Sequence, residues 1–133
     1  MGTAFGELMS EMKATLLVIV LIGTVVTGIF FVAFGQITVR KLRKNSVTKN
    51  RLGLELMSGW DIFNVAYSLC IPAILFRRAL SKTNSKIPNY FANSEIIYCN
   101  TTRFDRVLGR LFVISQTSTV VALLYAMAID RFP

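Results

Sequence analysis

Histidine is absent from the 133-residue sequence, and cysteine, proline and tryptophan occur only two, three and one times. The chain therefore lacks the side chain that most often serves as a general base, a haem ligand or a zinc ligand. Cys70 and Cys99 are too few for a structural metal site and are expected to be free thiols. No glycine-rich phosphate loop is present, and Glu55 and Asp61 do not share a helix face as a catalytic pair would. We expect no catalytic residue, no cofactor, no metal and no enzymatic activity.

Charge is missing from two long stretches. Residues 14–37 carry no charged side chain, and as a helix they would extend about 36 Å, enough to cross a hydrocarbon layer of ~30 Å. Residues 111–129 form a second uncharged stretch, although its first half is rich in hydroxyl groups. The hydrophobic content of 53% and the mean hydropathy of +0.55 exceed what one soluble core needs. Both stretches are predicted to be transmembrane helices.

The flank of the first stretch does not resemble a secretory signal. Residues 1–13 contain Glu7, Glu11 and Lys13 and are net negative, whereas a signal peptide begins with basic residues. The uncharged run also exceeds the ~7–15 residues of a signal core. We expect residues 1–13 to form a short interfacial helix and residues 130–133 to form a C-terminal tail.

Positive charge is concentrated in the middle of the chain. Of the 15 lysines and arginines, all but Lys13 and Arg131 lie between residues 40 and 110. Basic residues next to membrane spans are retained in the cytoplasm, and a crossing by residues 60–76 would place half of them on the wrong side. We predict that residues 60–76 do not cross and that residues 38–110 face the cytoplasm. Both termini would then lie on the other side of a plasma or inner membrane.

The middle of the chain also contains an apolar helical pattern. Within a helix predicted over residues 54–80, Asp61, Asn64, Ser68 and Pro72 recur at helical spacing and form one polar stripe. Such a helix lies in the membrane interface or packs against the spans, with a kink or break at Pro72. The predicted fold class is an all-α integral membrane protein, with an antiparallel hairpin of two transmembrane helices plus a buried or interfacial amphipathic middle helix. Three transmembrane helices are the alternative.

The segment before the second span contains a helix start signal. Thr102 and Asp105 match a capping box, which predicts an amphipathic lead-in helix over residues 103–110 that continues into the span. Residues 81–102 are predicted to be an ordered loop, in which residues 95–99 (EIIYC) have the composition of a short strand.

Basic side chains beside both spans suit an anionic surface. Each lysine or arginine near an anionic leaflet contributes on the order of 1 kcal/mol of attraction. The arginines of the lead-in helix share one face, where they can reach the phosphate level. Contact with lipid headgroups or another polyanion is predicted for Arg40, Lys41, Arg43, Lys44, Arg77, Arg78, Arg103, Arg106 and Arg110.

Small residues on both spans suit close helix packing. Within lipid, helices associate through close backbone approach and interhelical hydrogen bonds. Gln116 is the most polar group in either span, and we expect it to find a partner such as Thr24 or Thr27. The predicted packing residues are Gly23, Thr24, Thr27, Gly28, Ser115, Gln116, Ser118, Thr119, Ala122 and Ala126.

These features favour a non-catalytic small integral membrane protein that serves as a structural or accessory subunit of a larger membrane-bound assembly. Its partners would be anionic membrane lipids and other membrane subunits or further copies of itself. One alternative is a structural protein of the internal membrane of a lipid-containing virion, and only then would the basic segment bind nucleic acid. The other is a holin-like oligomer that permeabilises a membrane by self-association.

Overall fold

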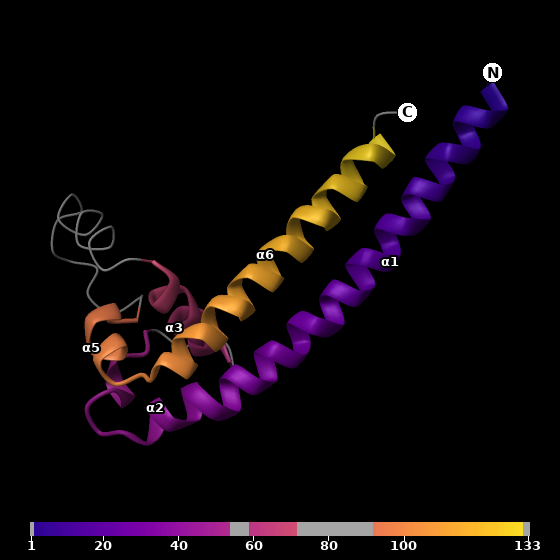
Figure 1. The fold of residues 1–133 in the computed structure, drawn as a ribbon. Helices are drawn as coiled ribbons and strands as arrows, with labels where there is room; N and C mark the ends of the chain where they lie inside the picture. The colour runs from indigo at the N-terminus through magenta and orange to yellow at the C-terminus, as the bar shows by residue number, and fades with distance from the viewer. Residues whose placement is uncertain (1, 54–58, 72–91, 132–133) are drawn as a thin grey trace, which may run out of the picture. The chain divides into compact units, whose positions relative to one another are not determined.

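The computed structural model describes residues 2–53, 59–71 and 92–131 of the chain (Figure 1). Every regular element in these ranges is helical, so the all-α prediction is confirmed for them. Residues 54–58 and 72–80 of the predicted middle helix, and residues 81–91 of the predicted loop, lie outside the described ranges. In chain order the elements are α1 (Gly2–Phe34), η1 (Gly35–Val39), α2 (Arg40–Lys44), η2 (Lys49–Arg51), α3 (Trp60–Cys70), α5 (Ser94–Cys99) and α6 (Arg103–Arg131).

The chain divides into two compact units. The first, called the hairpin unit, comprises Met1–Ile29 and Ile114–Pro133. The second, called the central unit, comprises Phe30–Val113 and therefore holds the end of α1, the shorter helices and the start of α6.

In the hairpin unit, α1 and α6 pack through positions that alternate four and three residues apart. Gly23 lies against Thr119, and Thr27 lies against Ser115, so the two helices run antiparallel. An average spacing of 3.5 residues is that of a coiled-coil seam. The half-buried positions are Met9, Lys13, Leu16, Val20, Gly23 and Thr27 on α1, and Ser115, Gln116, Thr119, Ala122, Ala126 and Ile129 on α6.

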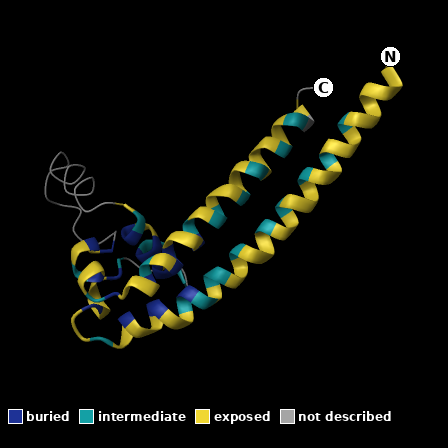
Figure 2. Cartoon of the chain, in the orientation of Figure 1, coloured by how far each residue is buried: buried dark blue, intermediate teal, exposed yellow. Residues whose placement is uncertain are grey.

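The other faces of these helices are apolar and exposed. Leu21 and Leu124, for example, are 66% and 60% exposed, and Figure 2 shows the same exposure along most of both helices. Two helices, Gly2–Lys44 and Arg103–Ile129, are long and apolar enough to cross a membrane. Core helices of soluble proteins are mostly buried, whereas the most apolar windows of these two helices contain almost no buried residue. Their length, composition and exposure indicate membrane association.

Helix α1 begins earlier than the predicted span. It runs without a break from Gly2 to Phe34, whereas a separate interfacial helix was predicted over residues 1–13. The charged residues Glu7, Glu11 and Lys13 precede the uncharged run, but glutamate and lysine are good helix formers, so the helix continues through them.

A π-helical turn, η1, follows α1 in the central unit. Its hydrogen bonds reach the fifth residue along the chain, so Phe34 and Val39 share a face, and both side chains are fully buried. The turn begins at Gly35, where an added Cβ would lie 2.7 Å from Cδ1 of Ile62. Glycine at this position therefore allows α3 to pack directly against the π turn.

An aromatic cluster forms the centre of the central unit. Phe34 and Phe112 are fully buried and stacked, with ring centroids 6.2 Å apart. The ring centroid of Phe63 in α3 lies 5.6 Å from that of Phe112 and 5.4 Å from that of Phe31. An added Cβ at Gly109 would lie 3.1 Å from the Phe34 ring, so this glycine lets α6 approach the end of α1.

Helix α3 is shorter than predicted. Its 11 residues span about 16 Å, roughly half the thickness of a hydrocarbon layer. Ile71 is extended, as a residue before proline prefers, so the helix predicted to run on to residue 80 with a kink or break at Pro72 already ends at Cys70. Asp61 and Ser68 of the predicted polar stripe are buried, which places this stripe toward the interior of the unit.

The strand predicted over residues 95–99 is wrong, because these residues belong to α5. Asn93 caps this helix, and its side-chain oxygen accepts a hydrogen bond from the backbone N–H of Ile96 at 3.3 Å. The local cap outweighs the strand preference of the paired isoleucines.

Candidate functional site

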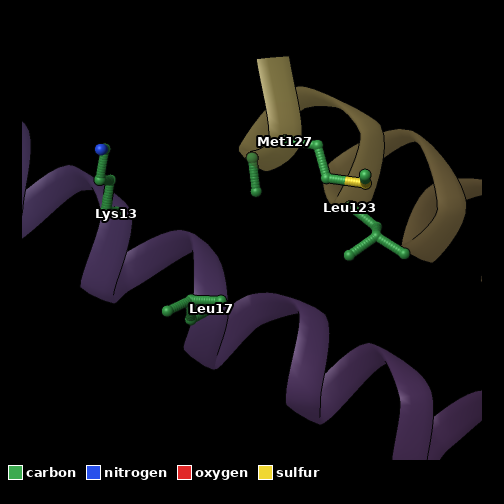
Figure 3. Close-up of a pocket in the computed structure, with 5 residues that line it drawn as sticks. Lys13, Leu17, Leu123 and Met127 are labelled. Atoms are coloured by element: carbon green, nitrogen blue, oxygen red, sulfur yellow. The ribbon is translucent and has the colours of Figure 1, made fainter. Parts of the chain in front are cut away.

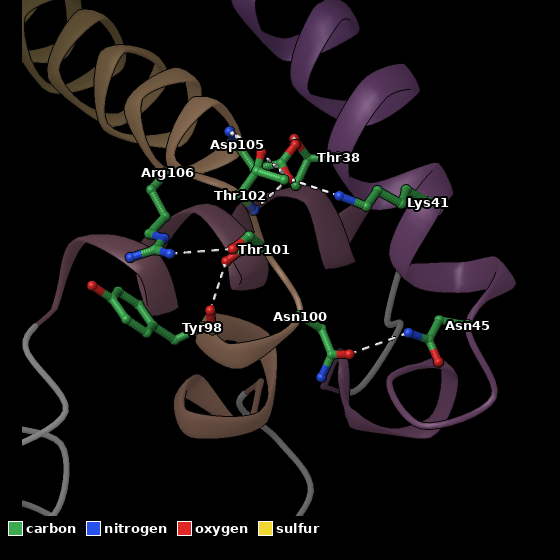
Figure 4. Close-up of polar contacts among 9 residues, drawn as sticks. All are labelled: Thr38, Lys41, Asn45, Tyr98, Asn100, Thr101, Thr102, Asp105 and Arg106. Atoms are coloured by element: carbon green, nitrogen blue, oxygen red, sulfur yellow. Dashed lines mark hydrogen bonds and ion pairs between the residues drawn. The ribbon is translucent and has the colours of Figure 1, made fainter.

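Asp105 is the centre of a polar cluster in the central unit (Figure 4). Its carboxylate accepts hydrogen bonds from the backbone N–H and the hydroxyl of Thr102 at 2.9 and 2.8 Å. The backbone N–H of Asp105 donates to the Thr102 hydroxyl at 3.3 Å, so the predicted capping box at the start of α6 is confirmed.

The same carboxylate also binds side chains of η1 and α2. Thr38 of η1 donates its hydroxyl proton to Asp105 at 2.8 Å, and Nζ of Lys41 lies 3.1 Å from the carboxylate. Burial alone would raise the pKa of Asp105, but the hydrogen bonds from Thr102, Thr38 and Lys41 outweigh burial and hold this pKa below its ordinary value. Asp105 is therefore a buried anion that connects α6 to η1 and α2.

A second buried carboxylate, Asp61, is paired with Arg43. Nε and Nη2 of Arg43 donate to the two carboxylate oxygens at 2.6 and 2.7 Å, the bidentate geometry that suits a guanidinium group. Asp61 lies in the first turn of α3, where a negative charge also complements the helix dipole. This pair links α2 to α3.

The predicted polyanion-contact residues therefore have different environments. Lys41 and Arg43 form ion pairs with buried carboxylates within the central unit. The side chains of these two residues are nevertheless 51% and 47% exposed, and Arg40, Lys44, Arg103 and Arg110 are exposed as well. Arg77 and Arg78 lie outside the described residues.

Arg106 belongs to an internal contact rather than to the exposed set. Its guanidinium carbon lies 4.0 Å from the centroid of the Tyr98 ring, and Nη2 donates to the carbonyl of Thr101 at 3.3 Å. Its Nε is buried and has no hydrogen-bond partner in the described part of the chain. Arg106 therefore orients Tyr98 beside the start of α6 (Figure 4).

The start of α6 presents three different faces. Leu108 and Phe112 are directed into the core, and the arginines lie along a second face. The third face is apolar and exposed, with Phe104, Val107 and Leu111 exposed by 62%, 53% and 44%. An exposed apolar face beside a row of arginines is typical of a helix at a membrane interface.

The predicted packing residues of the spans also separate into two groups. Thr27 lies 2.9 Å from the Ser115 hydroxyl and 3.4 Å from that of Thr119, and an added Cβ at Gly23 would lie 2.6 Å from Oγ1 of Thr119. Ala122 and Ala126 are half-buried in the same seam. Thr24, Gly28 and Ser118 are exposed outside it.

Gln116 does not bind the partners expected from the sequence. Thr24 donates instead to the carbonyl of Val20 at 2.8 Å, and Thr27 contacts Ser115 and Thr119. The side-chain oxygen of Gln116 is buried without a hydrogen-bond partner among the described residues. The three seam hydroxyls contact one another, and Thr119 also donates to the backbone carbonyl of Ser115 at 2.9 Å, so none of them binds the amide.

The hairpin seam opens toward the N-terminal end of α1. A cavity of about 240 Å³ lies between the two helices there and is lined by Lys13 and Leu17 of α1 and by Leu123, Ala126 and Met127 of α6 (Figure 3). Sequence patterning did not identify this cavity, because Lys13 was assigned to a segment outside the span.

The chain matches no family model, no curated protein and no solved structure among those compared. Across the residues that the structure describes, no three histidine, cysteine, aspartate or glutamate side chains are grouped as a metal site requires. The evidence for a function therefore comes from the ion pairs, the exposed apolar faces and the basic surface described above.

Proposed function

We propose that the protein is a non-catalytic integral membrane protein that serves as a structural or accessory subunit of a larger membrane-bound assembly. The observation that carries this proposal is the hairpin unit, which keeps its interhelical hydroxyl contacts inside the seam and exposes large apolar side chains on its other faces. In water this surface would be unfavourable, whereas in lipid it is compatible with the solvent. Residues 14–37 and 111–129 would be the two crossings.

The charge distribution supports one orientation for this hairpin. All basic residues except Lys13 and Arg131 lie between the two proposed crossings in the sequence. Under the positive-inside rule, the central unit faces the cytoplasm of a plasma or inner membrane, and both termini lie on the opposite side. Among the predicted contact residues, exposed Arg40, Lys44, Arg103 and Arg110 are available to anionic headgroups.

The N-terminal part of α1 supports a role within an assembly. The 33 residues of α1 extend about 50 Å, some ~20 Å more than the hydrocarbon layer. Phe5, Leu8 and Met12 lie on one side of this helix and are 66%, 56% and 40% exposed. A rigid helical extension with an apolar side is suited to packing against a larger membrane partner.

Native electrophoresis of membranes solubilised in a mild detergent tests this proposal. We expect the chain to migrate in a discrete complex much larger than the 14.9 kDa chain purified alone in the same detergent. Replacing Phe5 and Leu8 together by glutamine should release the chain from this complex, because the apolar side of the extension is lost. The matched control Glu7→Gln on the same helix should leave the complex intact. Identical migration of the membrane-derived and the purified chain would contradict an accessory role.

A further inference from the structure

A cavity of about 300 Å³ lies in the central unit, where α3, α5 and α6 meet. This volume is at the lower end of the ~300–1,000 Å³ that is usual for ligand sites. None of the sequence patterns singled it out, because its walls come from three separate helices. The polar lining residues are Ser68 and Cys70 of α3, Ser94 and Tyr98 of α5, and Arg110 of α6, and the Ser68 hydroxyl already donates to the carbonyl of Val65 at 2.7 Å.

Arg110 is the only charged residue among the described residues that line the cavity. In the described part of the chain its guanidinium forms no ion pair and no hydrogen bond, unlike the internally paired Lys41 and Arg43. Burial raises the pKa of the Cys70 thiol, and this effect outweighs the lowering by Arg110, so the thiol is neutral near pH 7. The positive charge at the cavity is therefore not neutralised by its neighbours.

The remaining polar groups of the cavity are neutral hydroxyls. Tyr98 is oriented by the Arg106 guanidinium stacked 4.0 Å from its ring centroid. Ser94 is buried, and its hydroxyl makes no hydrogen bond within the described ranges. One guanidinium with two hydroxyl donors suits an anion that offers several acceptor oxygens, as a phosphate group does.

Apolar groups lie beside these donors. Leu69 and Ile71 contribute to the cavity wall. Leu111, the residue after Arg110, belongs to the exposed apolar face at the start of α6. The polar group of a ligand bound here would contact a cation and hydroxyl groups, and its apolar part would contact apolar side chains.

We propose that this cavity binds the phosphate headgroup of an anionic phospholipid, with Arg110 as the principal contact. The inference rests on the proposed membrane placement, since only a membrane would supply this ligand at the start of the second span. It goes beyond general attraction to an anionic surface, because it assigns one cation and one set of hydroxyls to a single headgroup.

Alkylation of Cys70 by N-ethylmaleimide measures occupancy of the cavity directly. The full chain carrying Cys99→Ser is placed in nanodiscs of phosphatidylcholine alone or of phosphatidylcholine with phosphatidylglycerol. We expect about tenfold slower alkylation in the anionic discs, the protection given by a site that is about nine-tenths occupied. Equal rates in the two kinds of disc would overturn the proposal.

Matched variants separate the cavity from general charge effects. Arg110→Gln should abolish the difference between the two kinds of disc, whereas Arg103→Gln, the same charge change elsewhere on α6, should retain it. A Cys70→Ser chain, in which exposed Cys99 is the only thiol, reports how the anionic surface itself changes the alkylation rate. Protection that survives in Arg110→Gln, or that Cys99 shows to the same extent, would contradict the assigned contact.

Two further outcomes identify the source of a failure. Inorganic phosphate added to phosphatidylcholine discs should not protect Cys70. Protection by phosphate but not by phosphatidylglycerol would show that the cavity binds a soluble anion instead of a lipid, and would overturn the proposal. A chain that does not enter nanodiscs at all would refute the membrane placement itself. A chain that enters them but shows equal Cys70 rates would refute the headgroup site alone.

Discussion

At the scale of single residues, Asp105 is the side chain on which the polar contacts between α6, η1 and α2 converge. It caps α6 through Thr102, accepts a hydrogen bond from Thr38 and pairs with Lys41. A buried carboxylate is favourable only when its charge is compensated by hydrogen bonds and a cation, and here all of these are present. Asp105 is therefore the residue whose charge should matter most to the stability of this unit.

Asp105→Asn should destabilise the central unit by about 1–3 kcal/mol, the usual loss for hydrogen bonds to a charged group. Trp60, the only tryptophan, lies in this unit 6.3 Å from Phe63, so its fluorescence reports unfolding in denaturant. Glu11→Gln removes an exposed carboxylate from the hairpin unit and should leave this transition unchanged.

The pH dependence distinguishes the charge of Asp105 from its packing. Because the pKa of Asp105 is lowered in the folded chain, its contribution is complete above the ordinary carboxyl pKa of ~3.9 and is lost as the pH falls below that value. The stability lost in Asp105→Asn, measured as the difference in unfolding free energy from the unchanged chain, should therefore be largest at neutral pH and decrease in acid. A deficit of equal size at both pH values would assign the effect to packing.

At the scale of helices, the hairpin depends on one of the two small-residue pairs in the first span. Gly23 and Thr27 lie in the seam, whereas Thr24 and Gly28 are exposed. Sequence spacing predicted both pairs without separating them, because each has the same four-residue interval. What separates them is the alternating spacing of four and three residues that continues to Met9, which includes Gly23 but not Gly28.

Gly23→Leu should open the hairpin, and Gly28→Leu should not. A side chain at position 23 would overlap Thr119, and overpacking of this kind typically costs about 1–3 kcal/mol. Each 1.4 kcal/mol lowers the equilibrium constant for the closed hairpin about tenfold. At position 28 no atom lies within 4 Å of an added Cβ. Cysteines at positions 27 and 115, in a chain without Cys70 and Cys99, report the helix contact by disulfide formation in a thiol buffer. Equal cross-linking in both glycine variants would contradict the assigned seam.

The helix boundaries show what local sequence can and cannot predict. The start of α6 was predictable because Thr102 and Asp105 form their cap within a single turn. The end of α3 before Pro72 was predictable for the same local reason. The π turn at Gly35–Val39 has no comparable signal, because it depends on the packing of Ile62 from α3.

At the scale of the whole molecule, the sequence predicted the two long apolar helices better than the use of its charges. Hydropathy and length identify both long helices, since these are sums over many residues. The roles of Lys41 and Arg43 depend on Asp105 and Asp61, carboxylates 64 and 18 residues away, which no local pattern can assign. A basic run that suggests one lipid-binding cluster therefore contains two cations that bind buried carboxylates, Lys41 and Arg43, beside Arg40 and Lys44, which form no such pair in the described part of the chain.

The central claim is that the chain crosses the membrane twice, with the basic central unit on the cytoplasmic side. Single cysteines at Ser10, Ser46, Ser85 and Pro133, in a chain without Cys70 and Cys99, test it with a membrane-impermeant thiol reagent on intact cells. We predict labelling at positions 10 and 133, and labelling at 46 and 85 only after permeabilisation. Labelling at 85 together with protection at 46 would show that the middle of the chain crosses, and would contradict the account.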